Sequence, residues 1–267
     1  MPEVDSSIFH LQKLERLILE RCISLKSLSS NTCSPALHFF NARGCSNLKV
    51  FSVPFSSIHL SLFITEWDKN ELPSSLLHTQ NIKDLGFPIS DCLVDLPVNF
   101  CNNIWLSSPL NPEHDLFITL DKVLSSPAFM CVKILTFHYI PNLFEIPDSI
   151  SILSSLKSLT LIDMFIKSLP ESIKYLPRLI QVNVYRCTLL QSIPALEGFI
   201  PELVVWDCES LEVVLSSTGE PYDKPIPGFT VLLNCNNLDP HSYRTVLKDS
   251  MDGIELQARE YSEHEEN

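Results

Sequence analysis

The chain has 267 residues, 45% of them hydrophobic, and carries 32 acidic against 19 basic side chains, for a formal net charge of -13. This length can bury a substantial core without a metal or a disulfide to hold it. The negative charge repels phosphate backbones and anionic membranes, and no basic stripe offsets it. We therefore expect no nucleic-acid partner and no membrane partner.

The N-terminal residues, MPEVDSSIFHLQKL, lack a basic start followed by an apolar stretch, and no apolar run reaches membrane-spanning length. The nine cysteines are an odd number, and no Asn-x-Ser/Thr acceptor for glycosylation occurs. These features predict a protein of the reducing cytoplasm or of the nucleus.

One apolar pattern recurs along the chain with a period in the low twenties, and its clearest copy is LIQVNVYRCTLLQSIP at residues 179–194. The period and the LxxLxLxxCxxLxxIP form are typical of leucine-rich repeats. We count nine copies, of which those at 62–73 and 104–106 are degraded. The first position of the central apolar pair is filled by Leu17, Phe40, Leu62, Leu85, Ile104, Leu135, Leu159, Val182 and Leu203.

The spacing has a physical reason. The central apolar pair fits a short strand whose alternate side chains point to one face, and a turn and a loop or short helix then return the chain beside the previous strand. Stacked copies bury a continuous core that no single repeat could form. The predicted fold is an α/β leucine-rich-repeat solenoid, with a curved parallel sheet on the concave face and loops and short helices on the convex face.

An insertion at residues 107–128 interrupts the period. Leu116, Leu120, Val123 and Leu124 stand at helical spacing after acidic residues, which predicts a helix on the convex side. The insertion is either a loop that contacts a partner or a segment that packs over the back of the solenoid.

The solenoid is expected over residues 1–214, followed at 215–259 by a connection, a final strand and a capping helix, and at 260–267 by a disordered acidic tail. The final strand is expected at Phe229–Leu233, and the helix starts at Asp239 and Pro240. Its apolar face covers the C-terminal end of the solenoid or docks a partner. That face comprises Tyr243, Val246, Leu247, Met251 and Ile254.

A cysteine often follows the strand, where leucine-rich repeats usually have Asn. For Cys22, Cys45, Cys187 and Cys208 we expect a packing role as small apolar groups. No CxxC pair and no metal-spaced histidine pair occurs, so no metal site is predicted. No GxSxG elbow or glycine-rich dinucleotide loop is present either, and we predict a protein that is not an enzyme and uses no cofactor.

The candidate functional surface is the concave face, where the side chains that flank the two core positions of each strand are free of core constraints. Aromatic and arginine side chains recur there, and these residue types anchor interfaces. The predicted partner-binding residues are Arg16, Ile18, Phe39, Arg43, Phe63, Trp105, His138, Asn183, Tyr185 and Trp206.

The runs SLPESIKYLPRLIQVNVYRCTLLQSIPAL and VVWDCESLEVV resemble the repeats of plant intracellular immune receptors, the nucleotide-binding leucine-rich-repeat class with a Toll/interleukin-1-receptor domain. FTVLLNCNNLDPHSYRTVLKDSMDGIELQARE, residues 229–260, resembles the segment after the repeats in that class. The resemblance implies a module that recognises a pathogen effector or a host protein and, in a complete receptor, contacts the nucleotide-binding domain.

The chain departs from that class in two ways. It contains no GxxxxGK[ST] phosphate loop, and PEVDSSIFHLQKL reads like the middle of a repeat such as LPESIKYLPRL. We therefore expect a fragment that lacks the signalling domain, the nucleotide-binding domain and an N-terminal cap. The alternative is a free-standing leucine-rich-repeat scaffold or a non-functional truncated gene product.

Overall fold

The computed structural model describes residues 4–55, 60–65, 67, 71–73, 76, 82–109, 115–194, 202–214 and 229–244. The chain divides into two compact units, Met1–His138 and Tyr139–Asn267.

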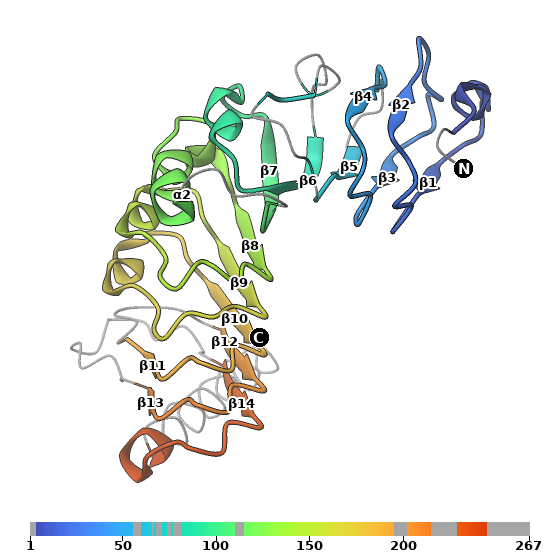
Figure 1. Cartoon of the computed structure of the whole chain (residues 1–267). Helices are drawn as coiled ribbons and strands as arrows, with labels where there is room; N and C mark the ends of the chain where they lie inside the picture. Colours follow the sequence, from blue (N-terminus) through green and yellow to red (C-terminus); the bar gives the residue numbers. More distant parts are fainter. Residues whose placement is uncertain are drawn as a thin grey trace, which may run out of the picture. The chain divides into compact units, whose positions relative to one another are not determined.

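The described strands of the first unit form a parallel sheet, as Figure 1 shows. In order across the sheet they are β1 (Arg16–Ile18), β3 (Phe39–Asn41), β5 (Leu60–Phe63), β6 (Ile82–Pro88), β7 (Cys101–Ser107) and β8 (Ile134–His138). A two-stranded parallel sheet pairs β2 (Ser27–Ser29) with β4 (Val50–Ser52). The helical elements are η1 (Ser6–His10), η2 (Asp91–Asp95), α2 (Leu116–Leu124) and η3 (Phe129–Cys131).

The register of this sheet follows the predicted repeats. Leu17 pairs with Phe40, and Phe40 pairs with Leu62. The series continues through the two degraded copies, where Leu62 pairs with Leu85 and Leu85 with Ile104, although the register between β5 and β6 shifts by one residue between Leu60 and Ser61. All five side chains are buried, so the repeat pattern and the core positions are confirmed in this unit.

The second unit repeats the same arrangement. Its described strands pair in parallel in the order β9 (Ser158–Ile162), β10 (Gln181–Tyr185), β12 (Glu202–Trp206) and β14 (Phe229–Leu233). Short strands β11 (Ser192–Ile193) and β13 (Val213–Val214) also pair, and η4 (Asp148–Ile152) and η5 (Glu171–Tyr175) lie on one side of the sheet (Figure 1). The prediction of a leucine-rich-repeat solenoid is confirmed.

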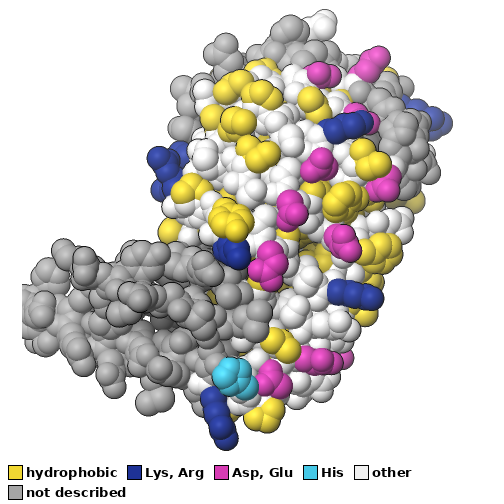
Figure 2. Space-filling model, turned by 90° about the vertical axis from the view of Figure 1, so that its left-hand side faces the viewer, with side chains coloured by type: hydrophobic (Ala, Val, Ile, Leu, Met, Phe, Trp, Pro, Cys, Tyr) yellow, Lys and Arg dark blue, Asp and Glu magenta, His cyan; other side chains and the backbone are white. Residues whose placement is uncertain are grey.

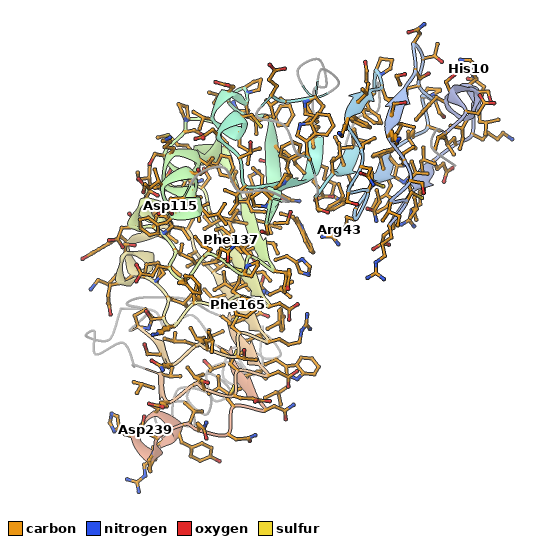
Figure 3. All side chains as sticks on the ribbon, viewed as in Figure 1. His10, Arg43, Asp115, Phe137, Phe165 and Asp239 are labelled. Atoms are coloured by element: carbon orange, nitrogen blue, oxygen red, sulfur yellow. The ribbon has the colours of Figure 1, made fainter. Side chains whose placement is uncertain are left out.

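The predicted helix of the insertion is present as α2. Asp115 precedes it and caps its first turn, because the Asp115 Oδ1 accepts a hydrogen bond from the Phe117 amide at 2.8 Å (Figure 3). Its buried side chains include the four leucine and valine positions expected from the spacing. The helix packs against η2 and η3.

A residue in the left-handed backbone conformation follows seven of the fourteen described strands, a feature that the sequence pattern did not predict. Its amide continues the ladder, as when Asp163 N donates to Tyr185 O at 2.9 Å and Arg186 N to Trp206 O at 2.8 Å. Each such residue stands just before the position that Cys22, Cys45, Cys187 and Cys208 fill in their repeats, which we call the cysteine slot. The set comprises Arg21, Gly44, Tyr139, Asp163, Arg186, Asp207 and Asn234.

The cysteine slot is a packing position in most copies. The thiol of Cys45 donates to Leu19 O at 3.1 Å, and Cys187 and Cys208 are buried with similar but longer contacts to a carbonyl of the preceding repeat. The prediction is wrong for Cys22, which is exposed. Among the described residues no repeat precedes this copy, so nothing supplies the carbonyl that the other cysteines use.

Residues 240–244 are helical, as expected from Asp239 and Pro240. Asp239 Oδ1 accepts from His241 N at 2.7 Å, and Ser242 Oγ in turn accepts from Val214 N at 3.0 Å, which ties this turn to β13. The remaining positions of the expected capping face, Val246, Leu247, Met251 and Ile254, lie outside the described residues, as do the connection at 215–228 and the tail at 260–267.

Candidate functional site

Five of the predicted concave-face residues gather in the first unit. Arg16 lies over the Phe39 ring at 4.5 Å, and the centroids of Phe39 and Phe63 are 6.0 Å apart. Phe63 meets Trp105 edge to face, with centroids 6.0 Å apart and an interplanar angle of 87°. The Arg43 guanidinium carbon lies 5.1 Å from both the Phe63 and the Trp105 ring centroids. We call Arg16, Phe39, Arg43, Phe63 and Trp105 the aromatic–arginine cluster.

Gly86 makes this cluster possible. In the register of the sheet Gly86 stands between Phe63 on β5 and Trp105 on β7. A Cβ at Gly86 would lie 2.3 Å from Phe63 Cδ1, so Phe63 can lie across β6 only because this position carries no side chain. Because β6 carries no side chain at this position, the ring of Phe63 on β5 meets the ring of Trp105 on β7 across β6.

Arg43 is the charged member that faces the least water. Burial lowers the pKa of its guanidinium, and the nearby Glu20 carboxylate acts in the opposite direction. Arginine nevertheless remains protonated in proteins, so the charge stays. None of the described residues accepts a hydrogen bond from its guanidinium group. A cation on two aromatic faces with free donors can bind a carboxylate strongly, because little water competes for it.

A polar row borders the cluster along the same strands. Asp84 on β6 accepts a hydrogen bond from Ser61 on β5 and one of 2.8 Å from Asn103 on β7. Its carboxylate is therefore held by its neighbours in the sheet. Arg16 and Arg43, the charged residues of the cluster, have no such fixed partner among the described residues of the sheet.

Tyr185 and Trp206 are neighbours in the second unit. They pair in the register of β10 and β12, and Ile162 and Leu233 extend their row on either side. Trp206 and Leu233 are 47% and 46% exposed. The structure thus adds two apolar residues to the pair that the sequence singled out.

Three predicted residues join neither group. Ile18 is exposed on β1 beside Asn41, and His138 is half-buried at the end of β8 beside Ser107. The expectation that Asn183 faces solvent is wrong, because it is buried and its Nδ2 donates to Thr160 Oγ1 at 3.2 Å. A short side chain between two flanking strands reaches its neighbours before it reaches water.

Within the described ranges, no group of three or more His, Cys, Asp or Glu side chains is arranged to hold a metal ion. The described helices are all too short or too polar to cross a membrane.

Comparison with known proteins points to one group. The chain is 28% identical over 240 residues to disease resistance-like protein DSC1 of Arabidopsis thaliana. The aligned region covers 87% of the chain and 18% of that protein. The chain is also 28% identical over 254 residues to a putative disease resistance protein of the same plant, covering 94% of the chain and 20% of the relative. The Arabidopsis protein SUPPRESSOR OF npr1-1, CONSTITUTIVE 1 is 26% identical over 223 residues, covering 78% of the chain and 14% of that protein.

No protein-family model matches the sequence. The chain spans about a fifth of the length of the first curated relatives that it matches. The similarity extends over most of the chain and therefore includes the repeats whose form suggested it. The resemblance of this leucine-rich-repeat chain to plant disease resistance proteins is confirmed.

Proposed function

We propose that this chain is a non-enzymatic protein-recognition module that acts in plant immunity, and that it binds a protein partner through the aromatic–arginine cluster. Its similarity to plant disease resistance proteins supports the biological role. The partner is a pathogen effector or a host protein that an effector modifies. In a longer receptor the same solenoid also contacts a nucleotide-binding domain.

The observation that carries the proposal is the contact of Arg43 with two aromatic rings. Phe63 and Trp105 are both half-buried, so part of each ring remains available to a partner. Tryptophan, tyrosine and arginine dominate the energetics of protein interfaces, and they act most strongly where neighbours exclude water. A partner that places an acidic side chain beside an apolar one fits this arrangement, because the carboxylate pairs with Arg43 and the apolar group covers the rings.

We propose the cytoplasm or the nucleus as the compartment. The thiols of Cys45, Cys187, Cys208 and Cys235 each lie against a backbone carbonyl of the preceding repeat, a position that suits a reduced thiol. Reduced cysteines persist in those compartments.

The test is affinity capture from leaf extract with three forms of the chain, each checked for unchanged circular dichroism. The first is the unaltered chain, the second carries Phe63→Ala and Trp105→Ala, and the third carries Phe144→Ala and Tyr175→Ala. Phe144 and Tyr175 are also exposed aromatic residues, but they lie in segments that connect strands. Figure 2 shows how hydrophobic side chains on the side of the molecule that it presents are scattered among acidic and other polar ones.

We expect at least one protein that the unaltered chain and the third form retain and the second form loses. That protein should then bind the purified chain directly, with at least a tenfold weaker affinity for the second form, as expected when an interface anchor is removed. If the three forms retain the same proteins, recognition through the cluster is wrong. The chain would then be better described as a scaffold or as a non-functional gene product.

A further inference from the structure

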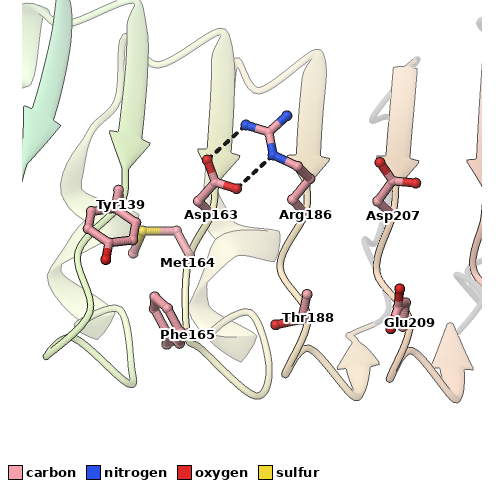
Figure 4. A pocket seen from close by; sticks show the side chains of 8 residues that line it. All are labelled: Tyr139, Asp163, Met164, Phe165, Arg186, Thr188, Asp207 and Glu209. Carbon is pink, nitrogen blue, oxygen red and sulfur yellow. Dashed lines mark hydrogen bonds and ion pairs between the residues drawn. The ribbon is translucent and has the colours of Figure 1, made fainter.

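A pocket opens on the second unit beyond the ends of β9, β10 and β12, and it shares no residue with the aromatic–arginine cluster. Its volume is about 540 Å³. It is lined by four left-handed residues and by four side chains of the turns that follow them: Tyr139, Asp163, Arg186 and Asp207, and Met164, Phe165, Thr188 and Glu209. Figure 4 shows Asp163, Arg186 and Asp207 in one row and Phe165, Thr188 and Glu209 in a second row beside it.

The repeat itself creates these two rows. The residue between them in each copy, Met164, Cys187 or Cys208, is buried in the core. The residues before and after this slot are exposed or half-buried, and their side chains lie on the outside of the turn (Figure 4). The two rows therefore continue the spacing of the parallel strands, about 4.8 Å from one copy to the next.

One end of the pocket is aromatic. Tyr139 and Phe165 meet edge to face, with centroids 6.2 Å apart and an interplanar angle of 68°. Tyr139 is 54% exposed and Phe165 is half-buried, so both rings keep surface that a ligand can cover. An apolar or aromatic side chain fits this end.

The other end is acidic. Arg186 donates from Nε and Nη2 to the two carboxylate oxygens of Asp163, at 2.7 and 2.8 Å, so the charges of this pair cancel within the pocket. Asp207 accepts from Asn234 Nδ2 at 2.7 Å and Glu209 is exposed. No described cation forms an ion pair with either of these carboxylates. The pocket thus carries excess negative charge at the end away from its aromatic pair.

We propose that this pocket binds an extended peptide segment that carries an aromatic side chain and, three residues away, a lysine or an arginine. Phe165 and Glu209 belong to strands two steps apart, a separation of about 10 Å at the usual strand spacing. Three residues of a peptide in the polyproline II conformation cover about the same distance, and the turn of three residues places both side chains on the same face. The Asp163–Arg186 pair lies between the two ends, where the Nη1 group of Arg186 can donate to a peptide carbonyl.

The charge of the pocket favours this occupant over an anionic one. A phosphate or a carboxylate would meet Asp207 and Glu209, while the arginine that could attract it is already bound in a bidentate pair. A cationic side chain gains from both carboxylates and leaves the ion pair intact.

The test uses the full chain and two blocked tetrapeptides, Phe-Gly-Gly-Lys and Phe-Gly-Gly-Glu, with binding measured by nuclear magnetic resonance titration. We expect the lysine peptide to bind at least tenfold more tightly than the glutamate peptide, and added salt to weaken it. Equal affinities, or no binding of the lysine peptide at millimolar concentration, would overturn the proposal. Because this comparison uses the unaltered chain, it does not depend on how any variant folds.

Variants then locate the site. Glu209→Gln should weaken the lysine peptide several-fold, Phe165→Ala should weaken both peptides, and Glu145→Gln should change neither, since Glu145 is exposed in the same unit but does not line the pocket. The Phe63→Ala and Trp105→Ala substitutions should also leave peptide binding unchanged, so failure of this proposal and failure of the proposed function remain distinguishable. Weaker binding of the lysine peptide to Glu145→Gln, or unchanged binding to Glu209→Gln, would contradict the assignment.

Discussion

The ring of Phe63 lies so close to the backbone of Gly86 that its position requires glycine there. The 2.3 Å between Phe63 Cδ1 and the place of a Cβ at Gly86 leaves no room for even a methyl group. The ring would have to leave its contacts with Trp105 and Arg43 before a side chain could be accommodated. The contacts of Phe63 with Trp105 and Arg43 therefore depend on the absence of a side chain at Gly86.

We predict that Gly86→Ala lowers the free energy of unfolding by about 1 to 3 kcal/mol, the usual cost of overpacking. Urea denaturation measures it. In a Phe63→Ala background the ring is gone, so the same substitution should be neutral or slightly stabilising, since alanine restricts the unfolded chain more than glycine. An equal loss in both backgrounds would show that the cost arises elsewhere in the sheet.

Cys101 is a second residue with a measurable consequence. Its thiol is buried and donates to Asn103 O at 3.1 Å, and burial raises the pKa of Cys101 to about 12. The unfolded chain releases this proton more easily. The stabilisation is therefore fully present below the ordinary thiol pKa and is lost as pH rises from there toward 12.

We predict that the free energy of unfolding falls between pH 9 and pH 10.5, and that Cys101→Ala reduces this slope. A single buried thiol can contribute at most about 1.4 kcal/mol per pH unit. Urea denaturation at a series of pH values gives the slope. The control is Cys22→Ala, which removes an exposed cysteine instead of a buried one. An unchanged slope in Cys101→Ala would contradict the burial argument.

At the scale of elements, α2 shows how an insertion can be accommodated in a repeat protein. The helix buries Leu116, Leu120, Val123 and Leu124 on one side, and Asp115 satisfies an amide of its first turn. The amphipathic spacing and the acidic residue before it were both visible in the sequence. What they could not show was the contact of this helix with η2, an element one repeat earlier in the chain.

We predict that Asp115→Ala lowers the free energy of unfolding by about 1 kcal/mol, the typical value of a lost N-cap. Asp115→Asn should retain most of it, because asparagine caps helices about as well as aspartate. Thermal or urea denaturation of the three proteins makes the comparison. If asparagine and alanine cost the same, the charge of Asp115 matters more than its hydrogen bond to Phe117 N.

The left-handed residues are the second lesson at this scale. Only Gly44 and Asn234, with Asp163 and Asp207 to a lesser degree, are residue types that favour this conformation. Tyr139 and Arg186 adopt it because the sheet on one side and the buried slot residue on the other fix the chain path. No local preference of a tyrosine or an arginine predicts that, so the pocket that these residues line was not recognisable in the sequence.

At the scale of the whole molecule, the described sheet of the first unit has β1 at its edge. Its outward row includes Ile18, which is 54% exposed. An edge strand presents unpaired backbone groups, and an apolar side chain beside them favours pairing between copies. The chain is therefore expected to be poorly soluble by itself.

We predict concentration-dependent self-association of the purified chain, reduced by Ile18→Lys. Sedimentation velocity over a range of concentrations measures it. The control is Ile152→Lys, which adds the same charge at an exposed isoleucine of η4 and should leave association unchanged. A chain that remains monomeric throughout the range, and melts cooperatively, would refute the edge argument.

The sequence by itself determined the apolar core positions of the strands and how the strands pair. Leu62 and Ile104 were assigned to degraded copies from their apolar spacing alone, and both take the predicted places in the register. This succeeds because the period of a solenoid is visible in the local sequence. Each repeat buries its apolar residues against a neighbour of the same form, so one pattern specifies the whole stack.

Only the tertiary structure decided which surface residues meet. Phe63 and Trp105 touch because β6 carries Gly86 between them, Asn183 is buried by its neighbours, and Asp163 binds Arg186 because two turns place them side by side. Such contacts join side chains from different repeats across the sheet. They depend on the size of what lies between them and on the backbone path at each turn, and neither quantity follows from the periodicity that specifies the fold.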